Sequence, residues 1–354
     1  MSLQRHDRPS PAVCRVIAVC LALAAASGVT AQERVEWKMQ SAIPGNLPVI
    51  GTTGKFVSEQ ISMISGGTFK LIWYEPNALV PPLEGLDAVS VGAVDAFYGV
   101  SGFWVGRIRS APLFTSHPFG PGPEEYLAWI EHGGGQELWD ELYEPWGVKG
   151  IPCGAIGPEA SGWFQSEIKS VEDLQGLKIR YPGYAGEVLQ ALGASTQMLA
   201  ASDVYSALER GTLDAAEFSM PAVDLELGLH RMVKHYYFPG WHQPATIGEL
   251  LVNLERWEAL REVHRAQLEL ICKAAIQRSL IESNAIQGDA LEAMRSDGVL
   301  IHRWPPELMD AFRAAWDEVV ARRSAEDATF RRVWESISAF RKEYAVWQEL
   351  GVAE

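Results

Sequence analysis

An arginine stands where a short apolar run meets a turn. In the segment "LQGLKIRYPGYAGEVLQALGA", residues 174–194, Leu177 to Ile179 favour a strand that ends at Arg180, and a Pro-Gly turn and a helix follow. Ligands of α/β folds bind at such strand ends. A guanidinium can hold a carboxylate through two parallel hydrogen bonds, which an ammonium cannot. Arg180 is therefore a candidate for binding a small organic anion, although a surface arginine paired with an acid would show the same pattern.

Three further segments present polar side chains at comparable places. "GTLDAAEFSM" predicts a strand that delivers Glu217 and Phe218 to its end, and a buried carboxylate there would need a cation or a hydrogen-bond donor. "GPEASGWF" presents Glu159, and the aromatic loop "FPGWHQP" presents His242 and Gln243. Each has an ordinary alternative, because Glu217 could face solvent and His242 could be a structural histidine.

Sequence signatures of catalysis are missing from the chain. It contains no G-x-S-x-G elbow, no P-loop, no H-E-x-x-H and no G-x-G-x-x-G after a predicted strand. Its eight histidines do not follow metal-ligand spacing. Binding without covalent chemistry is therefore favoured over an enzyme. The main alternative is an exported enzyme that uses His242 or Glu159 as a general base.

The N-terminal residues have the pattern of an export signal. Three arginines precede an apolar run at 16–26, and small residues lead up to Ala31. We expect residues 1–31 to be a signal peptide cleaved after Ala31, and the mature protein to be periplasmic. A membrane anchor is the alternative, but the apolar run is too short to span a bilayer.

Charge and cysteine content limit the partners and the chemistry. Without residues 1–31 the chain has 27 basic and 44 acidic residues, a net charge near −17, which argues against nucleic acid or anionic lipid as a partner. Only Cys153 and Cys272 remain of the four cysteines. Two distant cysteines predict neither a disulfide framework nor a zinc site, and Cys272 is expected to be a small core residue.

Strand and helix patterns alternate along the chain, which predicts an α/β fold with mostly parallel sheets and helices on their faces. Two such halves suggest a bilobed clamshell that closes on a ligand by hinge motion. We expect the first lobe at 32–156, the second at 157–243, a return to the first lobe with a long inter-lobe helix at 244–295, and a helical C-terminal tail at 296–354.

The C-terminal tail carries an apolar stripe at helical spacing. Intramolecular packing explains such a stripe, and a homodimer contact through the C-terminal helix is the alternative. The stripe consists of Trp334, Ile337, Phe340, Tyr344 and Trp347.

Three segments together resemble a known family. "LQGLKIRYPGYAGEVLQALGA", "ALERGTLDAAEFSMPAVDLELGLHRMVKHYYFPGWHQP" and "NALVPPLEGLDAVSVGAVDAFYG" look like the extracytoplasmic solute receptors of TRAP transporters (DctP type). The likeness is to the branch that binds 2-oxo acids or lactate with a metal ion, and it runs from about Val35 to the last helix. It implies the clamshell of periplasmic binding proteins, a small organic anion as ligand and membrane permease subunits as partners. A sensor subunit would share these features.

The resemblance also implies a role for the candidate residues. Arg180 corresponds to the arginine that clamps the ligand carboxylate. Glu217 and Phe218 correspond to a Glu-Trp pair that supplies oxygens to the metal, and phenylalanine suffices if the contribution is a backbone carbonyl.

Two positions depart from the family pattern in opposite senses. Glu159 stands where the family has a glutamine that binds metal and substrate, and Gln243 stands where it has a glutamate. The number of carboxylates is unchanged, so we hypothesise a compensating exchange around one hard cation, Na⁺ or Ca²⁺. The rival is that Glu159 displaces part of the ligand and selects another substrate or no metal.

The aromatic segment "YGVSGFWVG" resembles a part of the family that lines the ligand cleft. Ser101, Phe103 and Trp104 are therefore pocket candidates, and core aromatics are the equally good alternative.

Overall fold

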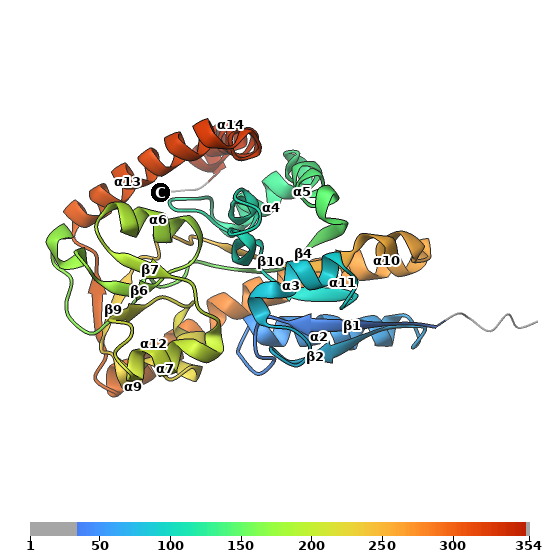
Figure 1. The fold of residues 1–354 in the computed structure, drawn as a ribbon, viewed down its shortest axis with the longest axis horizontal. Helices are drawn as coiled ribbons and strands as arrows, with labels where there is room; N and C mark the ends of the chain where they lie inside the picture. The colour runs from blue at the N-terminus through green and yellow to red at the C-terminus, as the bar shows by residue number, and fades with distance from the viewer. Residues whose placement is uncertain (1–33, 352–354) are drawn as a thin grey trace, which may run out of the picture. The chain divides into compact units, whose positions relative to one another are not determined.

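A computed structural model describes residues 34–351, so the predicted signal peptide lies outside the described residues. The fold is mixed α/β with two sheets, which confirms the predicted class (Figure 1). The strands are β1 (Val35–Ser41), β2 (Phe69–Tyr74), β3 (Ala96–Gly99), β4 (Val148–Ile156), β5 (Gly162–Phe164), β6 (Lys178–Arg180), β7 (Ser195–Gln197), β8 (Ala215–Ala216), β9 (His235–Phe238), β10 (Thr246–Asn253) and β11 (Leu300–Arg303).

Helices fill most of the intervening chain. Within residues 34–351, no helix combines the length and the apolar character that crossing a bilayer requires. The α-helices are α2 (Ile50–Ile64), α3 (Gly85–Ser90), α4 (Pro123–His132), α5 (Gly135–Tyr143), α6 (Gly183–Ala191), α7 (Ala201–Glu209), α8 (Pro221–Glu226), α9 (Leu229–Met232), α10 (Leu254–Ala259), α11 (Glu262–Ala285), α12 (Gln287–Ser296), α13 (Pro306–Glu326) and α14 (Ala328–Gly351).

Both sheets are mixed rather than mostly parallel, which corrects the prediction. The first sheet has the order β2-β1-β3-β10-β4, and β10 runs antiparallel to both of its neighbours. The second has the order β11-β9-β5-β8-β6-β7, and β5 runs antiparallel to both of its neighbours. The reversed strands β5 and β10 each follow a connection from one sheet to the other. Neither strand is preceded by a crossover helix, which is the connection that makes a strand parallel to its neighbour.

The predicted long helix after residue 260 is two helices. Ile286, with φ −97° and ψ 0°, caps the end of α11 and the start of α12. The next side chain, Gln287, accepts a hydrogen bond from the Ala222 backbone N–H in α8 at 2.9 Å and donates to the Ser283 carbonyl at 2.6 Å. Packing of α12 against α8 therefore overrides a sequence that would continue the helix.

The last two helices pack against helices from earlier in the chain. Helix α13 packs on α6, and α14 packs on α4 and α5 (Figure 1). In the apolar stripe of α14, Ile337 is fully buried, whereas Trp347 is 68% exposed. The stripe therefore serves intramolecular packing in its first half and stays uncovered in its second.

Cys153 and Cys272 form a disulfide, which the sequence analysis did not predict, although Cys272 is buried in the core as expected. Cys153 lies on β4 and Cys272 on α11, and both are fully buried. Helix α11 packs along β4, which brings together two residues 119 positions apart. This bond crosslinks the central helix to the edge of the first sheet.

Replacing both cysteines with alanine should lower the free energy of unfolding by about 2–5 kcal/mol, because the bond closes a long loop of the unfolded chain. Urea unfolding of the oxidised protein and of the double variant measures the difference. The wild-type protein unfolded in the presence of a thiol reductant serves as the control and should resemble the variant. Equal midpoints for oxidised protein and variant would contradict the expectation.

Candidate functional site

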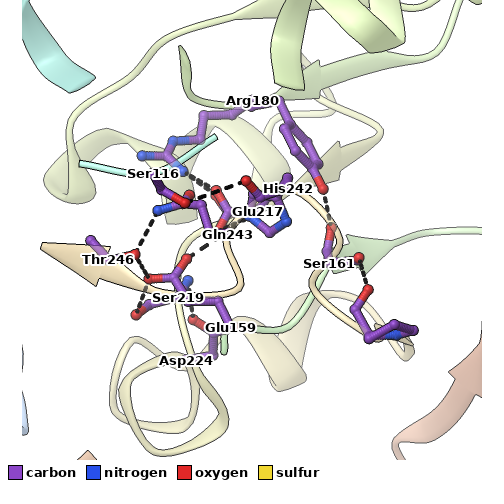
Figure 2. A network of polar contacts seen from close by, with 12 residues as sticks. Ser116, Glu159, Ser161, Arg180, Glu217, Ser219, Asp224, His242, Gln243 and Thr246 are labelled. Carbon is purple, nitrogen blue, oxygen red and sulfur yellow. Dashed lines mark hydrogen bonds and ion pairs between the residues drawn. The ribbon is translucent and has the colours of Figure 1, made fainter. Parts of the chain in front are cut away.

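A small cavity collects side chains from both sheets and their connections. Its volume is about 90 Å³, and it is lined by Arg180 at the end of β6, Glu159 after β4, Phe218 after β8 and Thr246 at the start of β10. At about 10–15 Å³ for each water-sized group, this space suits a molecule of a few heavy atoms. Figure 2 shows the polar groups converging on one another.

Arg180 and Glu217 form a buried ion pair in the second sheet. Arg180 Nη1 lies 2.7 Å from Glu217 Oε2 and also donates to the Glu217 carbonyl, and the two residues are 3% and 0% exposed. The parallel register of β6 and β8 pairs Arg180 with Ala216, so Glu217 follows directly beside it. Arg180 Nε donates to the Leu199 carbonyl at 3.3 Å, and the guanidinium carbon lies 5.2 Å from the centre of the Phe218 ring.

One nitrogen of the Arg180 guanidinium is available to donate to a ligand. Hydrogen bonds among residues 34–351 use its Nη1 and Nε atoms, and none uses Nη2. Because Arg180 lines the cavity, an anion there can reach a charged donor without breaking the pair with Glu217.

Among the described residues, only one of the two carboxylate oxygens of Glu159 accepts hydrogen bonds. Its Oε1 accepts hydrogen bonds from Ser219 Oγ at 3.3 Å and Thr246 Oγ1 at 3.1 Å. Gln243 Nε2 in turn donates to Thr246 Oγ1 at 2.8 Å, so Gln243 helps to orient Glu159 through Thr246. The other oxygen, Glu159 Oε2, is buried and has no hydrogen-bond partner among the described residues.

His242 completes a three-residue cluster at the same place. Its Nε2 lies 3.2 Å from Glu217 Oε1 and 3.9 Å from Glu159 Oε2. One potential ligand atom from each of the three residues falls within 4.8 Å of the others, and all three side chains are buried. Glu217 Oε1 and His242 Nε2 also lack a hydrogen-bond partner within residues 34–351. These convergent, unpartnered atoms fit a bound cation.

Burial dominates the electrostatics of the acids around the cavity. It raises the pKa of Glu159 well above its usual value, and the charges of Glu217 and Asp224 raise that pKa further. Burial likewise raises the pKa of Asp224 to about 7, although Trp163 Nε1 and the Tyr236 hydroxyl donate to it at 2.8 Å each. A cation beside Glu159 would oppose this effect and favour the ionised carboxylate.

The cavity brings together most of the residues singled out from the sequence. Arg180, Glu159, Phe218, Gln243 and Phe103 line it, and Glu217 is buried and paired with Arg180. From the sequence, His242 was considered as a possible general base or a structural histidine and not as a neighbour of the two glutamates, although the "PGWHQP" loop was the available signal. Several other lining residues were not singled out. Among those passed over are Ser116, His117, Tyr184, Ser219 and Thr246.

Ser101 and Trp104 do not line this cavity. The Ser101 hydroxyl lies 2.6 Å from Thr115 Oγ1, so it stands behind a lining residue. The Trp104 indole is buried in a cluster of hydrophobic core residues and donates to Glu249 Oε1 at 2.8 Å. Tyr143 donates to the same carboxylate at 3.0 Å. Trp104 therefore acts as a core aromatic that satisfies a buried acid.

These features define a binding protein for small solutes. The chain belongs to the DctP family, bacterial extracellular solute-binding protein family 7, whose model matches residues 41–327. This membership confirms the resemblance to the solute receptors of TRAP transporters.

Three similar proteins are also described as binding proteins for small solutes. The chain is 33% identical over 317 residues to a monocarboxylate 2-oxoacid-binding periplasmic protein of Nostoc sp., covering 89% of this chain and 86% of that protein. A TRAP solute-binding protein from Bordetella bronchiseptica, a mixed-occupancy dimer with copurified calcium and picolinate, is 31% identical with a TM-score of 0.88, covering 90% of this chain and 95% of that one. One from Pseudoalteromonas atlantica, with sodium and pyruvate, is 32% identical with a TM-score of 0.87, covering 90% and 97%.

The buried Glu249 carboxyl should make stability depend on pH. Burial raises its pKa from 4.5 to about 8, so the folded protein holds a proton that the unfolded chain releases between these values. Stability is then lost as pH rises through this window. Glu249→Gln should remove up to about 5 kcal/mol of this loss. Urea unfolding between pH 5 and 8 tests it, with the exposed Glu258→Gln as control, and an unchanged slope in Glu249→Gln would contradict it.

Proposed function

We propose that this chain is a periplasmic receptor of a TRAP transporter that captures a small monocarboxylate together with a cation. The ligand class is a 2-oxo or 2-hydroxy acid such as pyruvate or lactate. The observation that carries the proposal is the charged donor of Arg180 at a small cavity beside unpartnered carboxylate oxygens. Relatives that hold pyruvate with sodium or calcium support it.

Each residue has a role in this binding. Arg180 pairs with the ligand carboxylate through the nitrogen that its bond to Glu217 leaves free. Glu159 and Glu217 hold the cation, with the Phe218 carbonyl and Gln243 as further oxygen donors. The bound cation neutralises the two glutamates and supplies a contact for the keto or hydroxyl oxygen of the ligand. Phe103 and Phe218, which line the cavity, would exclude water from the bound ligand.

Transport supplies the setting for this binding event. Export by the signal at 1–31 places the receptor in the periplasm. Hinge closure between lobes at 32–156 and 157–243 then buries the ligand and presents a changed surface to membrane permease subunits. We infer binding without turnover, because the matched family consists of solute-binding proteins.

Arg180→Ala should weaken binding of pyruvate or lactate by about 100-fold or more, since it removes the partner of a buried carboxylate. Calorimetric titration of the mature protein with pyruvate, lactate and longer 2-oxo acids measures this. Removing the cation, with a chelator for Ca²⁺ and with sodium-free buffer for Na⁺, should weaken wild-type binding.

Two variants separate loss of binding from loss of fold. Arg180→Lys keeps a cation beside Glu217 and should still bind more weakly than the wild type, because the planar fork is lost. Arg210→Ala, at an exposed position, should bind as the wild type does. Failure of the wild-type protein to bind any monocarboxylate would refute the ligand class.

The uncovered end of α14 suggests a self-association surface. Val346, Trp347 and Leu350 are 59%, 68% and 80% exposed, on the same helix whose first half packs on α4 and α5. A related receptor is described as a dimer. We therefore propose that two copies associate through this end of α14, which would cover the exposed apolar side chains.

Trp347→Glu should shift the protein from dimer to monomer, because it places a charge in an apolar contact. Sedimentation velocity over a range of concentrations measures the change. Gln348→Glu introduces the same charge at the neighbouring exposed position and should have the smaller effect. A wild-type protein that stays monomeric at all concentrations would exclude this contact.

A further inference from the structure

A second, smaller cavity adjoins the one that Arg180 lines, and we call it the annex. Its volume is about 30 Å³, and at about 10–15 Å³ for each water-sized group it has room for roughly two such groups. The annex and the larger cavity share five wall residues, Ile43, Ile50, Val100, Ile156 and Thr246. A ligand whose carboxylate lies at Arg180 can therefore extend past these mostly apolar side chains into the annex.

The walls that the annex does not share come from the first sheet and from helices packed on it. Tyr98 lies on β3, Gly154 on β4 and Gly248 on β10, whereas Thr53 lies on α2. Gly154 and Gly248 pair directly across the antiparallel ladder. A Cβ on Gly154 would lie 2.8 Å from the Tyr98 hydroxyl oxygen, and one on Gly248 would lie 3.4 Å from it. The two glycines therefore leave room for the tyrosine hydroxyl at the annex.

Two hydroxyl groups in these walls can bind a ligand. Thr53 Oγ1 is buried and has no hydrogen-bond partner within residues 34–351. Tyr98 is 3% exposed, and burial raises the pKa of its hydroxyl, which therefore keeps its proton and can donate. A third hydroxyl, that of Ser279, is already engaged, because it accepts from the Ala155 N–H at 3.0 Å and donates to the Ala155 carbonyl at 2.8 Å.

The walls also select the chemistry of the group that fits the annex. None of the described residues that line it carries a charge, and Arg278, whose charge acts on Tyr98, is engaged by Glu282 at 3.3 Å. A second carboxylate of the ligand would therefore be buried without a cation, which is costly. A methyl group would leave the two hydroxyls without a partner. A neutral oxygen, in a hydroxyl or a carbonyl group, meets both requirements.

We propose that the annex is a subsite for the distal end of the ligand, where the hydroxyls of Tyr98 and Thr53 bind a neutral oxygen. This inference rests on the proposed function for the position of the ligand carboxylate at Arg180. It narrows the ligand class to 2-oxo or 2-hydroxy acids with a hydroxyl or carbonyl group at the end of a short chain. Pyruvate and lactate occupy only the part of the site near Arg180.

Calorimetric titration of the mature full chain with matched pairs of 2-hydroxy acids, in buffer that contains Na⁺ and Ca²⁺, tests the subsite. The hydroxylated acids are 2,4-dihydroxybutanoate, 2,5-dihydroxypentanoate and 2,6-dihydroxyhexanoate. Their partners, 2-hydroxypentanoate, 2-hydroxyhexanoate and 2-hydroxyheptanoate, carry a methyl group in place of the terminal hydroxyl. For at least one length, the hydroxylated acid should bind at least about tenfold more tightly than its partner, because the methyl group leaves buried hydroxyls unpaired.

Two variants assign this preference to the annex. Tyr98→Phe and Thr53→Val each remove one hydroxyl and nearly preserve the shape of the side chain. Each should weaken binding of the preferred hydroxylated acid by at least about threefold more than binding of its methyl partner. Tyr237→Phe is the matched control and should leave the preference unchanged, because Tyr237 is also buried but its hydroxyl bonds to the Ile168 backbone and lines neither cavity.

The outcomes separate the subsite from the receptor function. Binding of lactate or pyruvate with no preference for a terminal hydroxyl at any length overturns the subsite and leaves the receptor intact. A preference that survives in both variants, or equal weakening of both members of a pair, overturns the role of the two hydroxyls. Failure of every acid to bind the folded wild-type protein refutes the ligand class and the subsite together. The wild-type series tests the subsite even where a variant folds poorly.

Discussion

The buried ion pair of Arg180 and Glu217 determines the charge balance around the cavity. Neither side chain reaches solvent appreciably, so each charge depends on the other at 2.7 Å. Removing one partner of such a pair leaves an uncompensated buried charge that costs about 3–5 kcal/mol. Glu159 adds a second carboxylate, and no second arginine or lysine is among the described residues that line the cavity. With Glu159 ionised, the cluster would be short of positive charge, and a cation that enters with an anion would correct the shortage.

The fold gathers these charged residues because short strands and the connections between the two sheets meet at one place. Strands β6 and β8 have three and two residues, which is enough to fix Arg180 beside Glu217 and no more. The connection after β4 delivers Glu159, and the loop between β9 and β10 delivers His242. Backbone bonds lock these two connections together, since the Glu159 N–H donates to the Gln243 carbonyl at 3.2 Å. The site is thus built from segments that belong to both sheets.

The parts of the site that depend on local sequence were predictable. A strand that ends at a turn identified Arg180 and Glu217, because both signals lie within a few residues. The bond from Thr246 to Glu159 and the disulfide from Cys153 to Cys272 depend on the placement of β10 and α11 against β4, which spacing along the chain does not encode. The place of Trp104 could not be predicted, because an aromatic residue beside a cavity and one in a core have the same sequence pattern.

The two departures from the family pattern are not equivalent in space. Glu159 sits where its free oxygen approaches His242 and Glu217, while Gln243 turns its amide nitrogen toward Thr246. A glutamate at position 243 could not donate that hydrogen bond, and a glutamine at 159 would contribute no charge to the cluster. Each residue type therefore suits its own position: the carboxylate stands where a cation is needed, and the amide stands where a donor must orient a hydroxyl. This division of roles supports the hypothesised exchange with a physical reason that counting carboxylates alone does not provide.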